Sequence, residues 1–399
     1  MSSQKLSRDL KLLVLFSALR EVANLFLGTF LVSFIMSLSS EQILSVSIYK
    51  LFEYAATCAG FFLVAGWCKR YNKVAVFALN QIPKIALLVA IIVLGDSVPH
   101  YVISLGILYG LWSALYHLPM NSMVADKSTR HNVDAYMGAK IAACYATKVF
   151  TPVVLGFFID TGSFVQVANV LLIVAVLELF LTAFLSSSHH RSRSPIDFRG
   201  FFHCMRRFAV IRHMFAMEVM RGFGTGLLAS VITMYTIYMF KTDLNLGIFT
   251  TLFSICSIVT SWLTGRYGRP RYYPYMILGG MFVSLIGISL FVWEATPITF
   301  LIYNFVYATA IVLLDQLCSV NMYKLSKSKC VTSNHQIEYL VFRDFALFIG
   351  RWAGYVGLMY IGVFGGYAWL RWYLVIITLS IMLAGLLAMR MLPYLRMRK

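Results

Sequence analysis

Long apolar segments follow one another along almost the whole chain, and only short polar stretches separate them. The hydrocarbon core of a bilayer is about 30 Å thick, so a helix needs about 20 apolar residues to cross it. The chain has 399 residues, of which 60% are hydrophobic and 13% charged, and it can hold roughly twelve such helices joined by short loops. A mean hydropathy of +0.76 excludes a soluble enzyme. The sequence therefore predicts an all-α integral membrane protein.

Polar and turn-forming clusters divide the apolar sequence into segments of helical length. We expect six transmembrane helices near residues 12–38, 43–67, 74–95, 99–124, 135–159 and 164–186. Six more are expected near residues 208–240, 245–265, 272–293, 297–323, 336–363 and 368–392. The longest polar stretch, 187–207, predicts a cytoplasmic linker between an N-terminal half, 1–186, and a C-terminal half, 208–399.

The basic residues are distributed very unevenly among the predicted loops. The chain has 34 Lys and Arg against 16 Asp and Glu, a net charge of +18. Eight Lys and Arg lie inside predicted spans, and all the others except Lys241 and Arg371 lie on the side of the N-terminus. Because cytoplasmic loops carry the excess of Lys and Arg, we expect a multi-pass protein of the cell (plasma or inner) membrane with both termini in the cytoplasm. Topology explains the charge, so no nucleic-acid partner is expected.

The two predicted halves share residues at a nearly constant offset. Matching positions lie between 199 and 203 residues apart, which favours two parallel repeats related by an axis along the membrane normal. The matched pairs are Gly66 with Gly265, Arg70 with Arg269, Tyr136 with Tyr339, Lys140 with Arg343, Lys148 with Arg351, and Arg20 with Arg221.

Two Gly-rich basic segments, 66–73 and 265–271, follow the second helix of each half. They resemble the loop that members of the major facilitator superfamily carry at this place, although Cys68 or Lys69 stands where the family usually has an Asp. The resemblance implies twelve helices in two pseudo-symmetric six-helix bundles around a central cavity. It also implies gating loops at Gly66, Arg70, Gly265 and Arg269. Thr151-Pro152 with Gly156 is a degenerate form of the family's antiporter motif.

Several cations lie inside the predicted spans, where each ionisable side chain costs about 2.5–3.5 kcal/mol and usually faces the bundle interior. Lys140 and Lys148 are eight residues apart, which places them about 80° apart on one helix face and about 12 Å apart along the axis. Arg343 and Arg351 repeat this spacing, so the repeat symmetry would point four cations at one space suited to an anionic or phosphate-bearing ligand. The residues expected to bind substrate are Arg20, Lys140, Lys148, Arg221, Arg343, Arg351, Tyr116 and Tyr339.

Carboxylates inside the spans offer an alternative, because they could neutralise this cavity. A carboxylate buried beside a cation can also exchange a proton as substrate displaces it. The candidates for both roles are Glu21, Glu53, Glu218 and Asp315.

Some charged residues are spaced to meet on their own helix. Lys50 with Glu53, and Glu218 with Arg221, are three residues apart and are expected to form internal ion pairs. Arg343 and Asp344 are adjacent and about 100° apart around a helix, so we expect them to point to different places. Lys84 and Glu178 lie in helices that the resemblance places at the periphery, where a packing role is expected.

The leading functional hypothesis is a secondary active transporter that works by alternating access, with proton-coupled export of a small organic compound, anionic or amphipathic. Uptake of an organic anion and lipid or glycolipid flipping are alternatives. An integral-membrane lipid-modifying enzyme is an alternative of another class, but no catalytic motif supports it, so no enzyme activity is expected. Seven scattered cysteines without a CxxC predict neither a metal nor another cofactor. The expected partners are a small-molecule or lipid substrate, protons and the bilayer, and the protein is expected to be a monomer.

Overall fold

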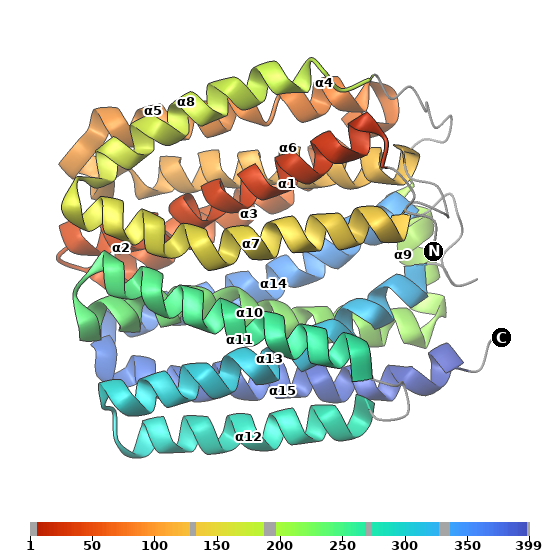
Figure 1. The fold of residues 1–399 in the computed structure, drawn as a ribbon. Coiled ribbons are helices and arrows are strands. Elements are labelled where there is room, and N and C mark those ends of the chain that lie inside the picture. Colours follow the sequence, from red (N-terminus) through yellow and green to blue (C-terminus); the bar gives the residue numbers. More distant parts are fainter. Residues whose placement is uncertain (1–5, 128–132, 187–196, 268–272, 327–335, 397–399) are drawn as a thin grey trace. The chain divides into compact units, whose positions relative to one another are not determined.

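The computed structural model describes residues 6–127, 133–186, 197–267, 273–326 and 336–396, and every element in these ranges is helical. The chain forms two compact units. Unit 1 comprises Met1–Pro195 and Lys241–Thr251, and unit 2 comprises Ile196–Phe240 and Leu252–Lys399. Within each unit, long helices lie side by side along their lengths (Figure 1). The all-α fold expected from the sequence is confirmed.

Unit 1 contains the helices that come first in the chain and the beginning of one later helix. Its elements are α1 (Arg8–Leu25), the π-helical turn η1 (Phe26–Phe30), α2 (Leu31–Leu38), α3 (Gln42–Arg70), α4 (Lys73–Ala78), α5 (Gln81–Leu94), the 3₁₀ segment η2 (Gly95–Tyr101), α6 (Val102–Lys127), α7 (Val133–Thr161), α8 (Phe164–Thr182) and the first residues of α11 (Asp243–Tyr267).

Unit 2 contains the remaining helices, including a short one just before its first long helix. Its elements are α9 (Phe198–Arg207), α10 (Ala209–Phe240), the rest of α11, α12 (Tyr273–Trp293), α13 (Pro297–Ser326), α14 (Gln336–Phe364) and α15 (Gly366–Arg396).

Helix boundaries follow local sequence signals. Ser7 caps α1 by accepting a hydrogen bond from the Leu10 amide, and Ser163 caps α8 in the same way. Gly95 ends α5 with φ +48° and Gly366 begins α15 with φ +56°, and this left-handed conformation is one that glycine adopts without strain. The prediction of one continuous helix over 74–95 is wrong in one detail, because a short turn separates α4 from α5.

Glycines bring helices into close contact beside the charged residues. A Cβ atom at Gly106 or Gly110 of α6 would collide with the backbone of α3 at Tyr49 and Glu53. In unit 2, a Cβ at Gly222 of α10 would collide with the backbone of α14 in the same way. These glycine contacts fix how α3 meets α6 and how α10 meets α14.

Ten stretches of the described chain are long and apolar enough to cross a membrane, and Pro297–Ile311 forms a shorter apolar helix. One of the ten, Lys73–Val124, has 52 residues, about twice what one crossing needs. It contains the two predicted spans near 74–95 and 99–124. The predicted count of twelve spans is thus met only in part, and the central cavity stays a prediction.

Part of the predicted linker is helical in the structure. Residues 187–196 lie outside the described part, but α9 forms within the stretch expected to be a linker. The Asp197 amide donates a hydrogen bond to Glu338 of α14 at 3.1 Å, and Phe201 packs on Tyr339 of the same helix. Helix α9 forms here because it buries apolar surface, since Phe201 is only 1% exposed. The division into halves 1–186 and 208–399 stays a prediction, and Lys241–Thr251 belongs to the compact unit 1.

Candidate functional site

Arg20 of α1 lies buried among side chains of α6 in unit 1. Its guanidinium carbon is 4.3 Å from the centre of the Trp112 ring and 4.2 Å from that of Tyr116. The Nη2 atom lies 3.3 Å from the Ser113 hydroxyl, to which it donates, and 3.1 Å from Nε2 of His117. The Nη1 atom is buried and has no hydrogen-bond partner in the part of the chain that the structure describes. Arg20 is thus a buried cation held by π faces and neutral polar groups.

Three carboxylates inside the predicted spans of unit 1 each contact a lysine. These ion pairs join residues of one helix or of two neighbouring helices. The pairs are Lys50 with Glu53 at 2.8 Å, Lys84 with Glu178 at 2.7 Å, and Lys148 with Glu21 at 3.4 Å.

These pairs decide which cations of unit 1 are neutralised. The expected internal pair of Lys50 and Glu53 is confirmed, and Glu21 neutralises Lys148 as the alternative interpretation required. Arg20 and Lys140 have no ion pair within the described ranges. Among the cations inside the predicted spans of unit 1, Arg20 and Lys140 are thus the ones without an ion pair in the described ranges, and Arg20 is the buried one.

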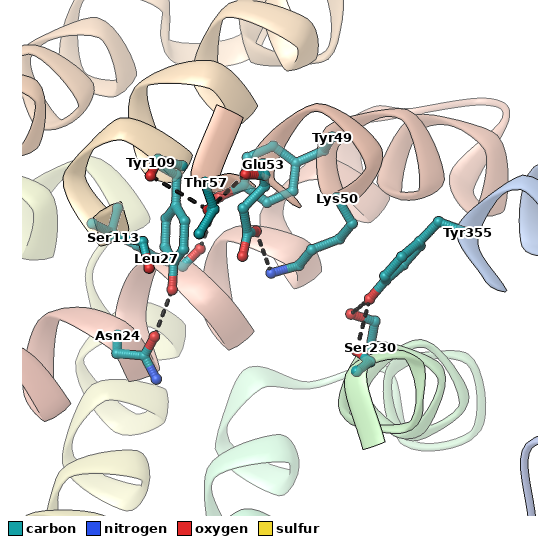
Figure 2. Close-up of polar contacts among 12 residues, drawn as sticks. Asn24, Leu27, Tyr49, Lys50, Glu53, Thr57, Tyr109, Ser113, Ser230 and Tyr355 are labelled. Atoms are coloured by element: carbon teal, nitrogen blue, oxygen red, sulfur yellow. Dashed lines mark hydrogen bonds and ion pairs between the residues drawn. The ribbon is translucent and has the colours of Figure 1, made fainter. Parts of the chain in front are cut away.

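A polar network surrounds the pair of α3 (Figure 2). The Lys50 ammonium lies 5.2 Å from the ring centre of Tyr49 and 5.3 Å from that of Tyr109, and points at the Glu53 carboxylate. The Tyr109 hydroxyl donates a hydrogen bond of 2.5 Å to Asn24 of α1. Lys50 and Glu53 are each 5% exposed, so this pair is isolated from water by aromatic rings.

In unit 2, one carboxylate serves two cations. Glu218 of α10 is fully buried and lies 3.1 Å from Arg221 and 4.0 Å from Arg343 of α14. The predicted pair of Glu218 and Arg221 is confirmed. The expectation that Arg343 and Asp344 point to different places is wrong, because Nη1 of Arg343 lies 3.8 Å from Oδ1 of Asp344. The long guanidinium side chain bridges the angle between adjacent positions that the helix backbone imposes.

The other predicted residues of unit 2 lie along α14. Tyr339 is fully buried, and the Arg351 side chain packs against Gly226 of α10. Near Gly226, the hydroxyls of Ser230 and Tyr355 are hydrogen-bonded at 2.7 Å, a buried contact between α10 and α14 (Figure 2). This contact holds the two helices that carry the arginines of unit 2.

The proposed gating residues are placed differently from the expectation. Gly66 and Arg70 lie within the last turns of α3, so the predicted loop is mostly helical, with only residues 71 and 72 between α3 and α4. Gly265 lies near the end of α11, whereas Arg269 lies outside the described residues. The side chain of Asp315 also lies outside the described part, so its predicted coupling role is untested.

Sequence reasoning did not assign Trp112 and Ser113 to a site. The signal that could have found them is a stripe of α6, in which Trp112 and Tyr116 are four residues apart, as are Ser113 and His117. Residues four apart lie on one helix face. An aromatic and polar stripe in an otherwise apolar helix thus predicts a buried polar partner, and Arg20 is that partner.

Ion pairs inside apolar helices, together with a buried arginine that has no direct ion pair in the described residues, are features of secondary transporters. A model of the major facilitator superfamily matches residues 12–328, and the chain belongs to this superfamily. No curated protein sequence matches the chain.

Solved structures share the fold. A D-xylose–proton symporter is similar with a TM-score of 0.75 and 13% identity, covering 98% of each chain. A bacterial homologue of the iron transporter ferroportin, in an inward-facing state, has a TM-score of 0.72 and 11% identity, covering 98% of this chain and 100% of that one. A human organic anion transporter has a TM-score of 0.65 and 14% identity, covering 96% of this chain and 99% of that one. At these identities the likeness concerns the fold alone.

Family membership confirms the resemblance inferred from the two Gly-rich basic segments. The chain is a multi-pass membrane transporter of a small molecule, not an enzyme.

Proposed function

We propose that this transporter carries an organic anion by alternating access, that protons drive it, and that it works in export. The observation that carries the proposal is Arg20, a buried guanidinium without a carboxylate partner in the described part of the chain. A bound organic anion would place a negative charge beside the Arg20 guanidinium.

The charge balance of unit 1 supports an anion over a cation as substrate. A buried charge is costly unless it is paired, and a guanidinium presents several donors that fit a carboxylate or a phosphate. The aromatic rings occupy the faces of Arg20 and two neutral groups occupy Nη2. Nη1 is thus the donor left for the ligand, and the nearby His117 side chain is exposed, which gives an approach to it.

Protons are proposed as the coupling ion because buried carboxylates lie beside cations in both units. Glu53 and Glu218 fit this role best, since each is at most 5% exposed and lies within 3.1 Å of a cation on its own helix. Glu21 is the third described candidate and is more exposed. Protonation of any of these would release its cation for a substrate.

Export and orientation rest on the sequence. The one-sided distribution of Lys and Arg favours cytoplasmic termini and the cell membrane. The degenerate antiporter motif near Pro152 favours export. We propose that the protein acts as a monomer. Uptake of an organic anion and lipid or glycolipid flipping are the competing hypotheses.

Reconstitution into vesicles with an imposed pH gradient tests the proposal. Radiolabelled organic anions, organic cations and a fluorescent lipid are screened while a dye reports proton movement. We expect anion flux with proton movement, and the variant Arg20→Gln should raise the anion KM about tenfold or more. Arg390→Gln, an exposed position on α15, is the matched control and should not change KM.

Three outcomes would contradict parts of the proposal. An unchanged anion KM in Arg20→Gln would remove the binding role of Arg20. Flux without proton movement would remove the coupling. Transport of the lipid alone would favour the flippase.

A further inference from the structure

A groove in unit 2 lies between the end of α14 and the beginning of α15. Its volume is about 690 Å³, within the range of ligand pockets. The residues that line it are mostly apolar or aromatic, and Arg371 is the single charged one among them. Gly357 and Tyr373 form part of the wall, where the Tyr373 hydroxyl donates a hydrogen bond of 2.5 Å to the carbonyl of Gly354.

The aromatic residues of the groove alone suggest only an interfacial belt. Tyr360, Trp369 and Trp372 are each more than 50% exposed, as indole and phenol rings at a membrane surface commonly are. The arginine does not fit that explanation. Its Nε atom is buried without a hydrogen-bond partner in the described chain, and its guanidinium carbon is 5.9 Å from the Trp372 ring centre.

The charge of the groove is positive. None of the described residues that line it is a carboxylate, and Arg371 lies in the second turn of α15, near the helix end that carries a partial positive charge. The lining becomes apolar towards Ile376, about 7.5 Å further along the helix. The groove is therefore cationic at one end and apolar at the other.

We propose that this groove binds an anionic phospholipid of the surrounding bilayer, with its phosphate at Arg371 and an acyl chain along Ile376. The polarity of the lipid matches that of the groove, from the helix end towards the membrane interior. The predicted orientation of the chain places this end in the outer leaflet. The inference does not depend on the transported substrate.

Native mass spectrometry of the full chain tests this site, with phosphatidylglycerol and phosphatidylcholine titrated separately. Arg371→Gln should weaken phosphatidylglycerol binding about fivefold and phosphatidylcholine binding less, because the choline ammonium offsets the charge of the same phosphate. Ala368→Phe fills the groove but keeps the arginine, and should weaken binding of both lipids. Arg390→Gln, at the other end of α15, is the matched control and should change neither.

The opposite results would overturn the site. Equal phosphatidylglycerol affinity in Arg371→Gln and the native chain would remove the role of the arginine. An equal loss in Arg390→Gln would mean that net charge, not the groove, determines binding. Displacement of the lipid by an equal concentration of inorganic phosphate would show that the apolar end contributes nothing. If Arg371→Gln does not fold, unchanged lipid binding in Ala368→Phe would by itself exclude the groove.

Discussion

Arg20 in unit 1 and Arg221 in unit 2 lie 201 residues apart, at matching positions of the predicted repeats, yet their surroundings differ. Arg221 contacts Glu218, three residues before it on its own helix, at 3.1 Å. The position that matches Glu218 is Ser17, whose hydroxyl donates to the carbonyl of Leu13 at 2.8 Å. Arg20 therefore has no carboxylate on its own helix at this spacing and lies between two aromatic rings instead.

One residue after the matched arginines, the carboxylate is in unit 1 and is absent from the matching position of unit 2. Glu21, which pairs with Lys148, matches Gly222, where a Cβ atom would collide with the backbone of α14. The repeats thus keep a cation at one depth but place the carboxylate before it in one unit and after it in the other. Repeat symmetry thus predicts where cations lie, not whether they are neutralised.

The largest expected effect is on folding stability in unit 2. Within the described residues, Arg221→Met leaves the fully buried Glu218 with only the longer ion pair to Arg343, and breaking a buried ion pair from one side costs about 3 kcal/mol. Arg20→Met leaves no carboxylate without a partner and should cost clearly less. Thermal unfolding of both variants in the same detergent measures the difference. Equal losses would mean that the two arginines are equivalent in the fold.

The second prediction makes unit 1 resemble unit 2. Ser17→Glu places a carboxylate three residues before Arg20, at the spacing of Glu218 and Arg221, so it should compete with an anionic substrate. We expect the anion KM to rise about 10- to 100-fold, as for the loss of a charged hydrogen bond. Ser17→Gln is the matched control, since it has the same size without the charge. A similar KM in both variants would show that volume, not charge, matters at this buried position.

Sequence periodicity predicted the helices well because each span must bury about 20 apolar residues, and polar clusters mark its ends. The pairs with a spacing of three, such as Lys50 with Glu53, were equally accessible because helix geometry alone brings such residues together. Pairs between helices, such as Lys148 with Glu21, depend on how α1 packs on α7. No spacing in a single sequence encodes that contact.

Side-chain length and apolar packing explain what could not be predicted from the sequence. Arg343 reaches its neighbour Asp344 because the guanidinium lies several bonds from the backbone, and a helical wheel considers only the Cβ direction. The helix α9 forms within the predicted linker because Phe201 is buried against α14, a contact outside the linker's own composition. The environment of Arg20 was missed for the same reason, since its partners lie on another helix.

A third prediction concerns the aromatic environment that distinguishes Arg20 from Arg221. Trp112→Leu removes the ring that lies 4.3 Å from the guanidinium carbon, while Trp112→Phe keeps a π face. Because the ring positions the cation, we expect the anion KM to rise about fivefold in the leucine variant and less in the phenylalanine variant. Transport assays at equal protein amounts measure both. An equal rise in the two variants would assign the effect to packing.

The smallest expected effect compares two lysines of α7 within unit 1. Lys148 pairs with Glu21, whereas Lys140 is partly buried and has no ion pair in the described part of the chain. If uncompensated charge attracts the anion, Lys140→Gln should raise the anion KM about twofold to threefold, with little change in stability. Lys148→Gln leaves Glu21 without its cation, so its main effect should be on the pH dependence of transport. The same vesicle assay, repeated at several pH values, separates the two, and a larger KM effect from Lys148→Gln would mean that the paired lysine contacts the substrate.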